Sequence, residues 1–335
     1  MFLNVLLSQE IDSSINIADF QYPDVHGIPI ILDETGENTF YLNERNTEFI
    51  SDGKIIYEKF QSFDLKFIPI ILIMVVSGWG ILFVRWNLLL KNQSIIIPTR
   101  QNFLIYLAGF ALAISPLKSG ELIKAELLKN KFEISRTKTV PIIVMERFYD
   151  ILGTVFVAVI LGSFFLSISF LPIILGVAAL TIAIFVVIYV KSVFNFFTSK
   201  LLRFKFLERF KEPLINSQDV FRMSSSRKLI FISTTLTIIW RLVEGIGIYF
   251  VLLGFGIDVI EYLEIISIYS TSVILGAVSM LPAGIGVTEG SFGGLLSLLE
   301  IEISFALALA IVVRLFTLWF GVGVGFISLK LSKSL

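Results

Sequence analysis

The sequence predicts an all-α polytopic membrane protein, with transmembrane helices in an inverted repeat and two re-entrant broken helices. Of its 335 residues, 56% are hydrophobic and only 16% are charged, whereas a soluble domain carries about a quarter charged residues. Residues 151–190 contain no charged side chain. One helix of that length would be about 60 Å long, roughly twice the thickness of the hydrocarbon core. This run therefore predicts two spans, joined by a turn near 167–172.

Apolar runs predict the individual elements. Full spans are expected at roughly 67–90, 140–166, 171–190, 229–253 and 304–329. Two further apolar stretches, 102–117 and 262–299, contain Pro and Gly where a helix would have to continue, in SPLKSGE and in LPAGIGVTE. Proline lacks the backbone N–H group and clashes with the preceding turn, so we expect both of these helices to break.

The first 66 residues differ from the rest of the chain. Residues 1–66 carry 12 acidic and 4 basic side chains, whereas residues 67–335 carry 15 acidic and 23 basic ones. Short stretches with β-propensity lie at 28–32, 39–42 and 54–60, separated by Pro and Gly. We therefore expect an acidic extracytoplasmic segment over 1–66, β-rich or loosely ordered, and a transmembrane domain over 67–335.

Lysine and arginine in short loops predict the orientation, because cytoplasmic loops carry an excess of both. Segments 85–100, 118–138 and 191–228, with the C-terminus, hold 20 of the 23 basic residues that follow position 66. We expect these segments to be cytoplasmic, residues 1–66 to lie outside, and the protein to reside in the plasma membrane. For 85–100 and 118–138 to share one side, the stretch between them must enter the membrane and return.

Landmarks recur at an offset of about 166 residues. Arg147 lies 31 residues after Pro116, and Arg314 lies 32 residues after Pro282. A glycine turn and a glutamate follow each of these prolines. The recurrence predicts two repeat units of related structure.

The two units are expected to have opposite orientations. Residues 262–299 lie between segments without basic residues, so this broken stretch is expected to enter from outside, whereas the first one enters from the cytoplasm. The predicted units cover about 67–166 and 171–329. Inverted repeats with discontinuous helices near the midplane are typical of transporters, because each unit can open one side of a shared site.

Charged residues inside the predicted spans are candidates for function. A charge in the bilayer interior costs at least about 2.5–3.5 kcal/mol, so it normally faces a partner or a water-filled cavity. Asp150 follows Arg147 by one turn and Glu244 follows Arg241 by one turn. Each of these two pairs of residues could be an internal ion pair that stabilises the helix bundle, or could contact a transported group. Arg314 has no charged neighbour within its own helix and is the most available cation.

The helix breaks are candidates for anion binding. A helix that ends inside the protein leaves backbone N–H groups unpaired and directs the positive end of its dipole at the break. Gly120, Gly284 and Gly286 would let the backbone approach an anion closely, and Lys118 would add charge. Alternatively, these glycines only permit tight helix packing, as we expect for the three glycines in 290–294.

Acidic residues follow both glycine turns. Glu121 and Glu289 could pair with the arginines, or could bind a proton or a cation. The candidate substrate-binding residues are therefore Lys118, Gly120, Glu121, Arg147, Asp150, Arg241, Glu244, Pro282, Gly284, Gly286, Glu289 and Arg314.

Absent residue types exclude several chemistries. The chain has no Cys, and its single His, His26, lies outside every apolar run. Disulfides, thiolate nucleophiles, cysteine-ligated zinc and a buried histidine site are therefore excluded. We find no Gly-rich nucleotide-binding motif and no Asp-x-Asp metal motif. We expect no catalytic residue, cofactor, metal or nucleic-acid partner, and the sequence does not define an oligomeric state.

Three motifs, SGELIKAELL, VMERFYDILG and LPAGIGVTEG, occur in this order and at a characteristic spacing. Over roughly 67–330 the chain resembles the membrane region of lysylphosphatidylglycerol synthases, which also defines a wider group of stand-alone flippase-like membrane proteins. The resemblance implies that the motif residues belong to a lipid-translocating region. The matching positions are Gly120, Glu121, Glu146, Arg147, Asp150, Pro282, Gly284, Gly286 and Glu289.

Two features depart from that family. The soluble aminoacyl-transfer domain of the synthases does not follow the last predicted span, so lipid aminoacylation is not expected. The family normally begins with a membrane helix, whereas this chain begins with an acidic polar stretch. We expect either about 20 apolar residues encoded in frame upstream, or genuine loss of that helix.

The first functional hypothesis is a lipid or lipid-linked-precursor flippase. The anionic head group of a membrane phospholipid or polyprenyl-linked lipid would pass the three intramembrane arginines, while its chains stay in the bilayer. One alternative is a membrane-embedded transferase that acts on a lipid-phosphate with Glu121, Asp150 or Glu289 as a base. Another is a non-transporting partner of a cell-envelope enzyme.

Overall fold

The computed structural model describes residues 61–115, 120–165 and 220–334, scattered positions between 172 and 196, and two short strands near the N-terminus. The chain divides into two compact units, Met1–Glu58 and Lys59–Leu335. In the first unit, β1 (Ile30–Leu32) pairs antiparallel with β2 (Thr39–Tyr41). Two of the predicted extended stretches therefore contain strands, and the third, at 54–60, lies outside the described residues.

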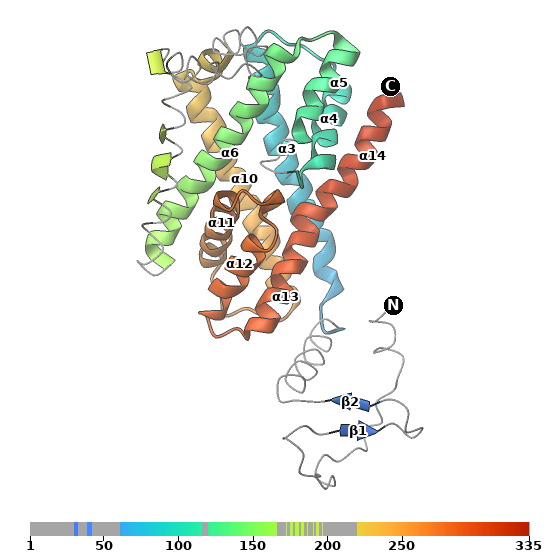
Figure 1. The fold of residues 1–335 in the computed structure, drawn as a ribbon, viewed down its shortest axis with the longest axis vertical. Coiled ribbons are helices and arrows are strands. Elements are labelled where there is room, and N and C mark those ends of the chain that lie inside the picture. Colours follow the sequence, from blue (N-terminus) through green and yellow to red (C-terminus); the bar gives the residue numbers. More distant parts are fainter. Residues whose placement is uncertain are drawn as a thin grey trace. The chain divides into compact units, whose positions relative to one another are not determined.

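The second unit is built from helices (Figure 1). In chain order its elements are η2 (Leu65–Phe67), α3 (Ile68–Asn92), α4 (Thr99–Ala108), η3 (Gly109–Leu112), α5 (Ile123–Phe132), α6 (Arg136–Phe165), α10 (Arg227–Gly254), α11 (Tyr262–Val278), η7 (Pro282–Gly284), α12 (Val287–Ser297), α13 (Ile303–Arg314), η8 (Leu315–Trp319) and α14 (Phe320–Ser334). The element η8 is a π-helical turn, so α13 and α14 form one continuous long helix.

Four helices in the described part of the chain are long and apolar enough to cross a membrane. They cover Leu65–Asn92, Arg136–Phe165, Arg227–Gly254 and Ile303–Ser332. These helices confirm four predicted spans and the all-α membrane fold. The predicted span at 171–190 lies largely outside the described residues.

Large apolar side chains are exposed on all four long helices. Examples are Ile73 on α3, Phe156 on α6, Phe231 on α10 and Ile327 on α14. Exposure of such side chains to water is unfavourable in free energy, whereas contact with the apolar chains of lipids is not. Their distribution fits helices whose outer faces contact the bilayer.

The two predicted interruptions are visible in the backbone. In the first stretch, α4 ends at Ala108 and is followed by the 3-10 turn η3, and the next α-helix is α5. After Val278 the second stretch passes through η7 before α12 begins. Ala283, Gly284 and Gly286 all have positive φ, which a right-handed helix does not contain. Residues 116–119, including Pro116, lie outside the described residues.

The long helices contact both broken stretches. Helix α3 packs along α10, and α6 packs along α11. The last long helix touches both broken stretches, because α13 packs on α12 while α14 packs on α4 and η3. Figure 1 shows α4 and α5 towards one end of the bundle and α11 and α12 towards the other.

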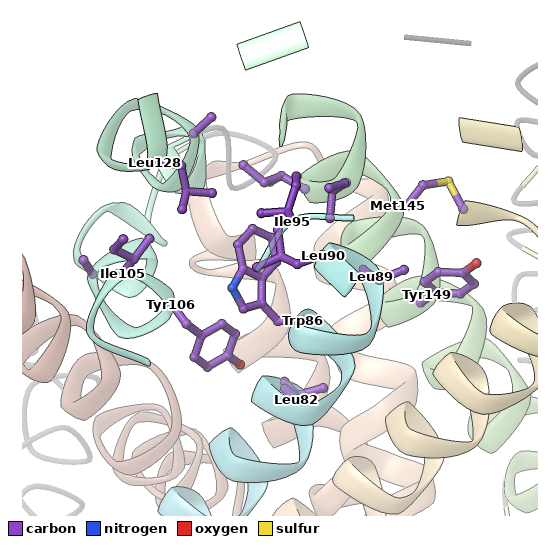
Figure 2. Close-up of a cluster of buried hydrophobic side chains, with 14 of the residues drawn as sticks. Leu82, Trp86, Leu89, Leu90, Ile95, Ile105, Tyr106, Leu128, Met145 and Tyr149 are labelled. Atoms are coloured by element: carbon purple, nitrogen blue, oxygen red, sulfur yellow. The ribbon is translucent and has the colours of Figure 1, made fainter. Parts of the chain in front are cut away.

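Each broken stretch has a hydrophobic core of its own. The first core joins α3, α4, α5 and α6, and Figure 2 shows Trp86 of α3 surrounded by side chains that include Tyr106 and Leu90. The second core joins α10, α11, α12 and α13 and includes Leu252 and Phe292. Because interiors are close-packed, the two cores hold the polar residues between them in fixed positions.

Candidate functional site

A cavity of about 290 Å³ lies inside the helical unit. Its walls come from α3, α4, α6, α10, α11, α12, α13 and the π turn, and from the two interruptions. Aromatic rings contribute much of the apolar wall, and charged side chains from both halves of the chain reach it. The charged residues that line it are Glu121, Arg147, Asp150, Arg241, Glu244 and Arg314.

The first half contributes a continuous chain of ion pairs. Nη1 of Arg147 lies 3.0 Å from Oε1 of Glu121 and 2.8 Å from Oδ2 of Asp150. Oδ1 of Asp150 lies 2.6 Å from Nη2 of Arg85. Nζ of Lys124 lies 2.5 Å from Oε2 of Glu146 and 3.2 Å from Oε2 of Glu121. These residues form the first ion network: Arg85, Glu121, Lys124, Glu146, Arg147 and Asp150.

The members of this network are largely shielded from water. The side chain of Arg85 is fully buried, and those of Lys124 and Glu121 are 1% and 2% exposed. Buried charges lose their hydration and need partners of the opposite sign. The three cations of the network match its three carboxylates, so its net charge is zero.

Neutral groups also contact the buried cations. Nη1 of Arg85 donates a hydrogen bond to Oγ1 of Thr237 over 2.5 Å, which connects α3 to α10. Nζ of Lys124 lies 4.5 Å from the ring centroid of Trp86 and 5.6 Å from that of Tyr106. Such cation–π contacts strengthen when water is excluded.

Arg241 of α10 forms a separate pair. Its Nη1 donates to Glu244, one turn later, and its Nε donates to Oγ1 of Thr154 over 2.9 Å. The guanidinium also lies 4.2 Å from the ring centroid of Trp240. Both predicted pairs between residues one turn apart, Arg241 with Glu244 and Arg147 with Asp150, are therefore present.

Arg314 has a partner on a neighbouring helix. Its Nε lies 2.7 Å from Oε1 of Glu289 on α12, and its Nη2 donates to the carbonyl of Ala283 over 2.6 Å. The expectation that Arg314 is the most available cation is therefore wrong. Glu289 precedes it by 25 residues, and only the packing of α12 on α13 brings the two together. Of the roles considered for Glu121 and Glu289, the structure shows pairing with arginines: Glu121 pairs with Arg147, and Glu289 pairs with Arg314.

The backbone N–H groups at the two interruptions are already engaged. The amide of Gly286 donates to Oε2 of Glu289 over 2.6 Å, and the amide of Gly120 donates to Oγ of Ser115 over 2.5 Å. These two amides are therefore not free for an anion in this conformation. Gly284 lines the cavity, whereas Gly120, Pro282, Gly286 and Glu289 do not, and Lys118 lies outside the described residues.

The alternative reading of the glycines, tight packing, applies to some of them. A Cβ on Gly120 would overlap Leu112, and one on Gly284 would lie 2.6 Å from Oγ1 of Thr288. Gly293 packs against Leu307 in the same way, as predicted. No described residue lies within 4 Å of a Cβ built on Gly290 or Gly294, so the described part of the chain shows no tight packing at those two positions.

Sequence reasoning missed several members of the site. Arg85 was assigned to the loop 85–100, but it lies within α3 and is fully buried. Lys124 was counted among the basic residues of a cytoplasmic loop, although it lies in the protein interior. The signal that could have identified Lys124 is its position one turn after Glu121, a spacing that favours an ion pair. Thr237 and Thr154 gave no such signal.

Fold and site together define a polytopic membrane protein whose bundle contains a partly open cavity with charged and aromatic walls. Residues 49–325 match the family model of the lysylphosphatidylglycerol synthase TM region, so the chain belongs to this family. The resemblance noted from three motifs is thereby confirmed.

Two relatives cover most of the chain. A UPF0104 membrane protein of Pyrococcus horikoshii is 24% identical over 289 residues, which is 76% of this chain and 84% of that protein. A UPF0104 membrane protein of Methanothermobacter thermautotrophicus is 26% identical over 259 residues, 70% of this chain and 76% of that protein. No solved structure matches this chain.

Proposed function

We propose that this protein is a flippase that moves the anionic head group of a lipid or lipid-linked precursor between membrane leaflets. The observation that carries the proposal is the cavity inside an apolar bundle, because arginines from both halves of the chain, Arg147, Arg241 and Arg314, line it. Cations inside a membrane protein mark a path for anions or a structural pair. In the proposed mechanism these three arginines have both roles, since each is held in an ion pair and each also lines the cavity.

The equivalent positions of two ion pairs support an inverted repeat. In each half, a glutamate after the interruption pairs with an arginine on the next long helix: Glu121 with Arg147, and Glu289 with Arg314. The broken stretches lie towards opposite ends of the bundle (Figure 1). Units of about 67–166 and 171–329, with two re-entrant hairpins, account for this arrangement.

The size and walls of the cavity suit a head group rather than a whole lipid. Its volume of about 290 Å³ lies near the lower end of ligand pockets. Trp79, Phe110 and Trp240 supply apolar and aromatic walls beside the charges. In the proposed mechanism the head group enters the cavity while the acyl or prenyl chains stay in the bilayer.

The proposed orientation places the protein in the plasma membrane with α5 near the cytoplasm and the N-terminal segment outside. Asn130→Cys and Val259→Cys test it, because the native chain has no cysteine and both positions lie outside the long helices. An impermeant thiol reagent added to intact cells should label only the variant at position 259. Labelling at position 130 would contradict a first hairpin that enters from the cytoplasm.

The transferase alternative requires a carboxylate that accepts a proton during catalysis. Glu121, Asp150 and Glu289 are each held in ion pairs with arginines, so a substrate would have to displace an arginine before one of them could act as a base. This pairing favours transport over transfer.

Reconstitution into vesicles tests the proposed function. The wild-type protein should move a fluorescent phosphatidylglycerol between leaflets without ATP, faster than protein-free vesicles do. Arg314→Ala and the double variant Arg147→Ala with Asp150→Ala should lose most of this activity, whereas Arg136→Ala, at an exposed site outside the cavity, should retain it. Wild-type rates in both cavity variants would show that these arginines are structural and that the proposed site is wrong.

A further inference from the structure

We infer that Arg241 and Glu244 form a subsite of the cavity that binds neighbouring hydroxyl groups of the lipid head group. This inference rests on the proposed flippase function and names the chemical class of the head group: a phosphate linked to a glycerol or a sugar, without an amine. It follows from the hydrogen-bonding atoms that this ion pair leaves unused and from the aromatic rings beside it.

The pair of Arg241 and Glu244 has one donor and one acceptor to spare. Arg241 donates through Nη1 to Oε2 of Glu244 and through Nε to Oγ1 of Thr154. Within the described part of the chain, Nη2 of Arg241 and Oε1 of Glu244 form no hydrogen bond, and these two atoms are not fully buried. Because both residues line the cavity, each offers one atom to a ligand there.

A pair of neighbouring hydroxyl groups matches these two atoms. A hydroxyl group can both donate and accept a hydrogen bond. One hydroxyl can accept from Nη2 of Arg241 while its neighbour donates to Oε1 of Glu244, and the ion pair itself stays intact. The side chains are only 6% and 11% exposed, so an alkyl group in the same place would exclude water and leave both charged groups without these hydrogen bonds.

The aromatic rings favour a neutral group over an amine. The guanidinium of Arg241 lies 4.2 Å from the ring centroid of Trp240 and 5.8 Å from that of Tyr269. Both rings therefore already contact a cation, and this cation also holds Glu244. An ammonium group beside them would be repelled by the guanidinium, most strongly where water is excluded. A polyol adds no charge, and its CH groups can pack on the aromatic walls.

Polar contacts connect this subsite to the arginine that is most accessible to a phosphate. Arg147 is 21% exposed, more than the other two arginines of the cavity. Thr154 follows Arg147 by two turns of α6, about 10 Å along the axis, and accepts the hydrogen bond from Arg241. Because both arginine side chains extend from their helices into the cavity wall, one head group can place its phosphate at Arg147 and its hydroxyl groups at Glu244.

The other arginine pair in the second half offers no such acceptor. Oε1 of Glu289 accepts from Nε of Arg314, and Oε2 accepts from the amide of Gly286. Glu289 also does not line the cavity. The inference therefore assigns the hydroxyl groups to Arg241 and Glu244 and not to Arg314 and Glu289.

A comparison of lipids in vesicles that contain the purified protein tests the inference directly. Phosphatidylpropanol is the matched ligand, because it has the charge and the three head-group carbons of phosphatidylglycerol but no head-group hydroxyl. Fluorescent phosphatidylglycerol should be translocated about 10- to 100-fold faster than fluorescent phosphatidylpropanol, the factor expected for lost hydrogen bonds to charged groups. Equal rates would overturn the inference and leave the flippase function intact. Faster translocation of phosphatidylethanolamine than of phosphatidylglycerol would also overturn it, because the subsite would then prefer an amine.

Binding can be measured without transport. In detergent, phosphatidylglycerol should raise the unfolding temperature of the protein more than phosphatidylpropanol does. Selective stabilisation without translocation of any lipid would support the subsite and contradict the flippase function, whereas absence of both would overturn both. Phosphatidylinositol separates the two sources of hydroxyl groups: preference for it or for phosphatidylglycerol over phosphatidylpropanol supports the subsite, and the preferred lipid shows whether a ring or an open chain fits.

A double variant assigns the preference to this pair. Arg241→Gln with Glu244→Gln removes both charges together, so that neither is left buried without its partner. The ratio of the two translocation rates should fall towards one. Glu261→Gln is the matched control, since Glu261 is exposed at the start of α11 and outside the cavity, and it should retain the wild-type ratio. A wild-type ratio in the folded double variant, with both rates lowered equally, would show a purely structural pair and contradict the inference. If the double variant does not fold, the wild-type ratio still decides the inference.

Discussion

The two halves of the helical unit satisfy their intramembrane arginines in different ways. In the first half, six side chains share partners in the first ion network, and Arg147 and Lys124 each bridge two carboxylates. In the second half, Arg241 and Arg314 each have one carboxylate, and hydroxyl or carbonyl groups also contact them. A change in a shared network is transmitted to every member, whereas a separate pair responds locally. The first half is therefore the part of the cavity suited to respond to a ligand.

Removal of Arg85 should have the largest effect on stability. The change Arg85→Ala removes the fully buried cation that lies 2.6 Å from Asp150 and leaves Thr237 without its donor, and the loss of a buried ion-pair partner costs about 3–5 kcal/mol. Thermal unfolding in detergent measures the loss, with Arg136→Ala as a surface control. The double variant Arg85→Ala with Asp150→Ala should lose less than the sum of its single variants. Strict additivity would show that the network is not shared.

Removal of Arg314 should destabilise less. Glu289 keeps the amide of Gly286, so the cost of Arg314→Ala should lie within the range of about 1–3 kcal/mol for a buried polar group that loses its partner. Comparison with Arg85→Ala in the same unfolding assay tests the contrast between the halves. An equal or larger loss for Arg314→Ala would show that the second half is coupled as strongly as the first.

Two glycines on α14 test how the last helix joins the first broken stretch. A Cβ on Gly325 would overlap the backbone of Ala111, whereas no residue in the described part of the chain lies within 4 Å of one on Gly323. Gly325→Ala should therefore cost about 1–3 kcal/mol through overpacking. Gly323→Ala should be neutral or stabilise the helix by up to about 1 kcal/mol, because alanine favours helix. Similar unfolding temperatures for both variants would contradict the close contact of α14 with η3.

The exposed pair between Glu126 and Arg136 should have the smallest effect. Arg136 holds the pKa of Glu126 below its ordinary value, so any stabilisation is present above the ordinary glutamate range and is lost as pH falls through the lowered pKa. Water and salt screen exposed charges. Glu126→Gln should leave the unfolding temperature unchanged at neutral pH and high salt. A clear loss under those conditions would mean that charges at the edge of the bundle matter as much as those in its interior.

The sequence predicted the spans well because a bilayer imposes length and apolarity on any helix that crosses it. The run before Asn92 and the run that contains Arg314 could each be recognised without any knowledge of packing. The interruption near Pro282 was also predictable, because proline and glycine act locally on the backbone.

The partners of the charged residues could be predicted only where they lie one turn apart. The pair of Arg147 and Asp150 follows from helix geometry. The pair of Arg314 and Glu289 and the contact of Arg85 with Asp150 depend on which helices pack together, which the local sequence does not encode. Arg85 was misplaced for a related reason: counts of basic residues cannot distinguish a loop from the last buried turns of a helix.

The central claim is that an anionic head group binds in the cavity beside Arg147. An experimental structure in nanodiscs of phosphatidylglycerol tests it most directly. We expect phosphate density within hydrogen-bonding distance of Arg147, whose Nε has no hydrogen-bond partner among the described residues. A cavity without lipid, with lipid bound only on the outer faces of the helices, would contradict the account.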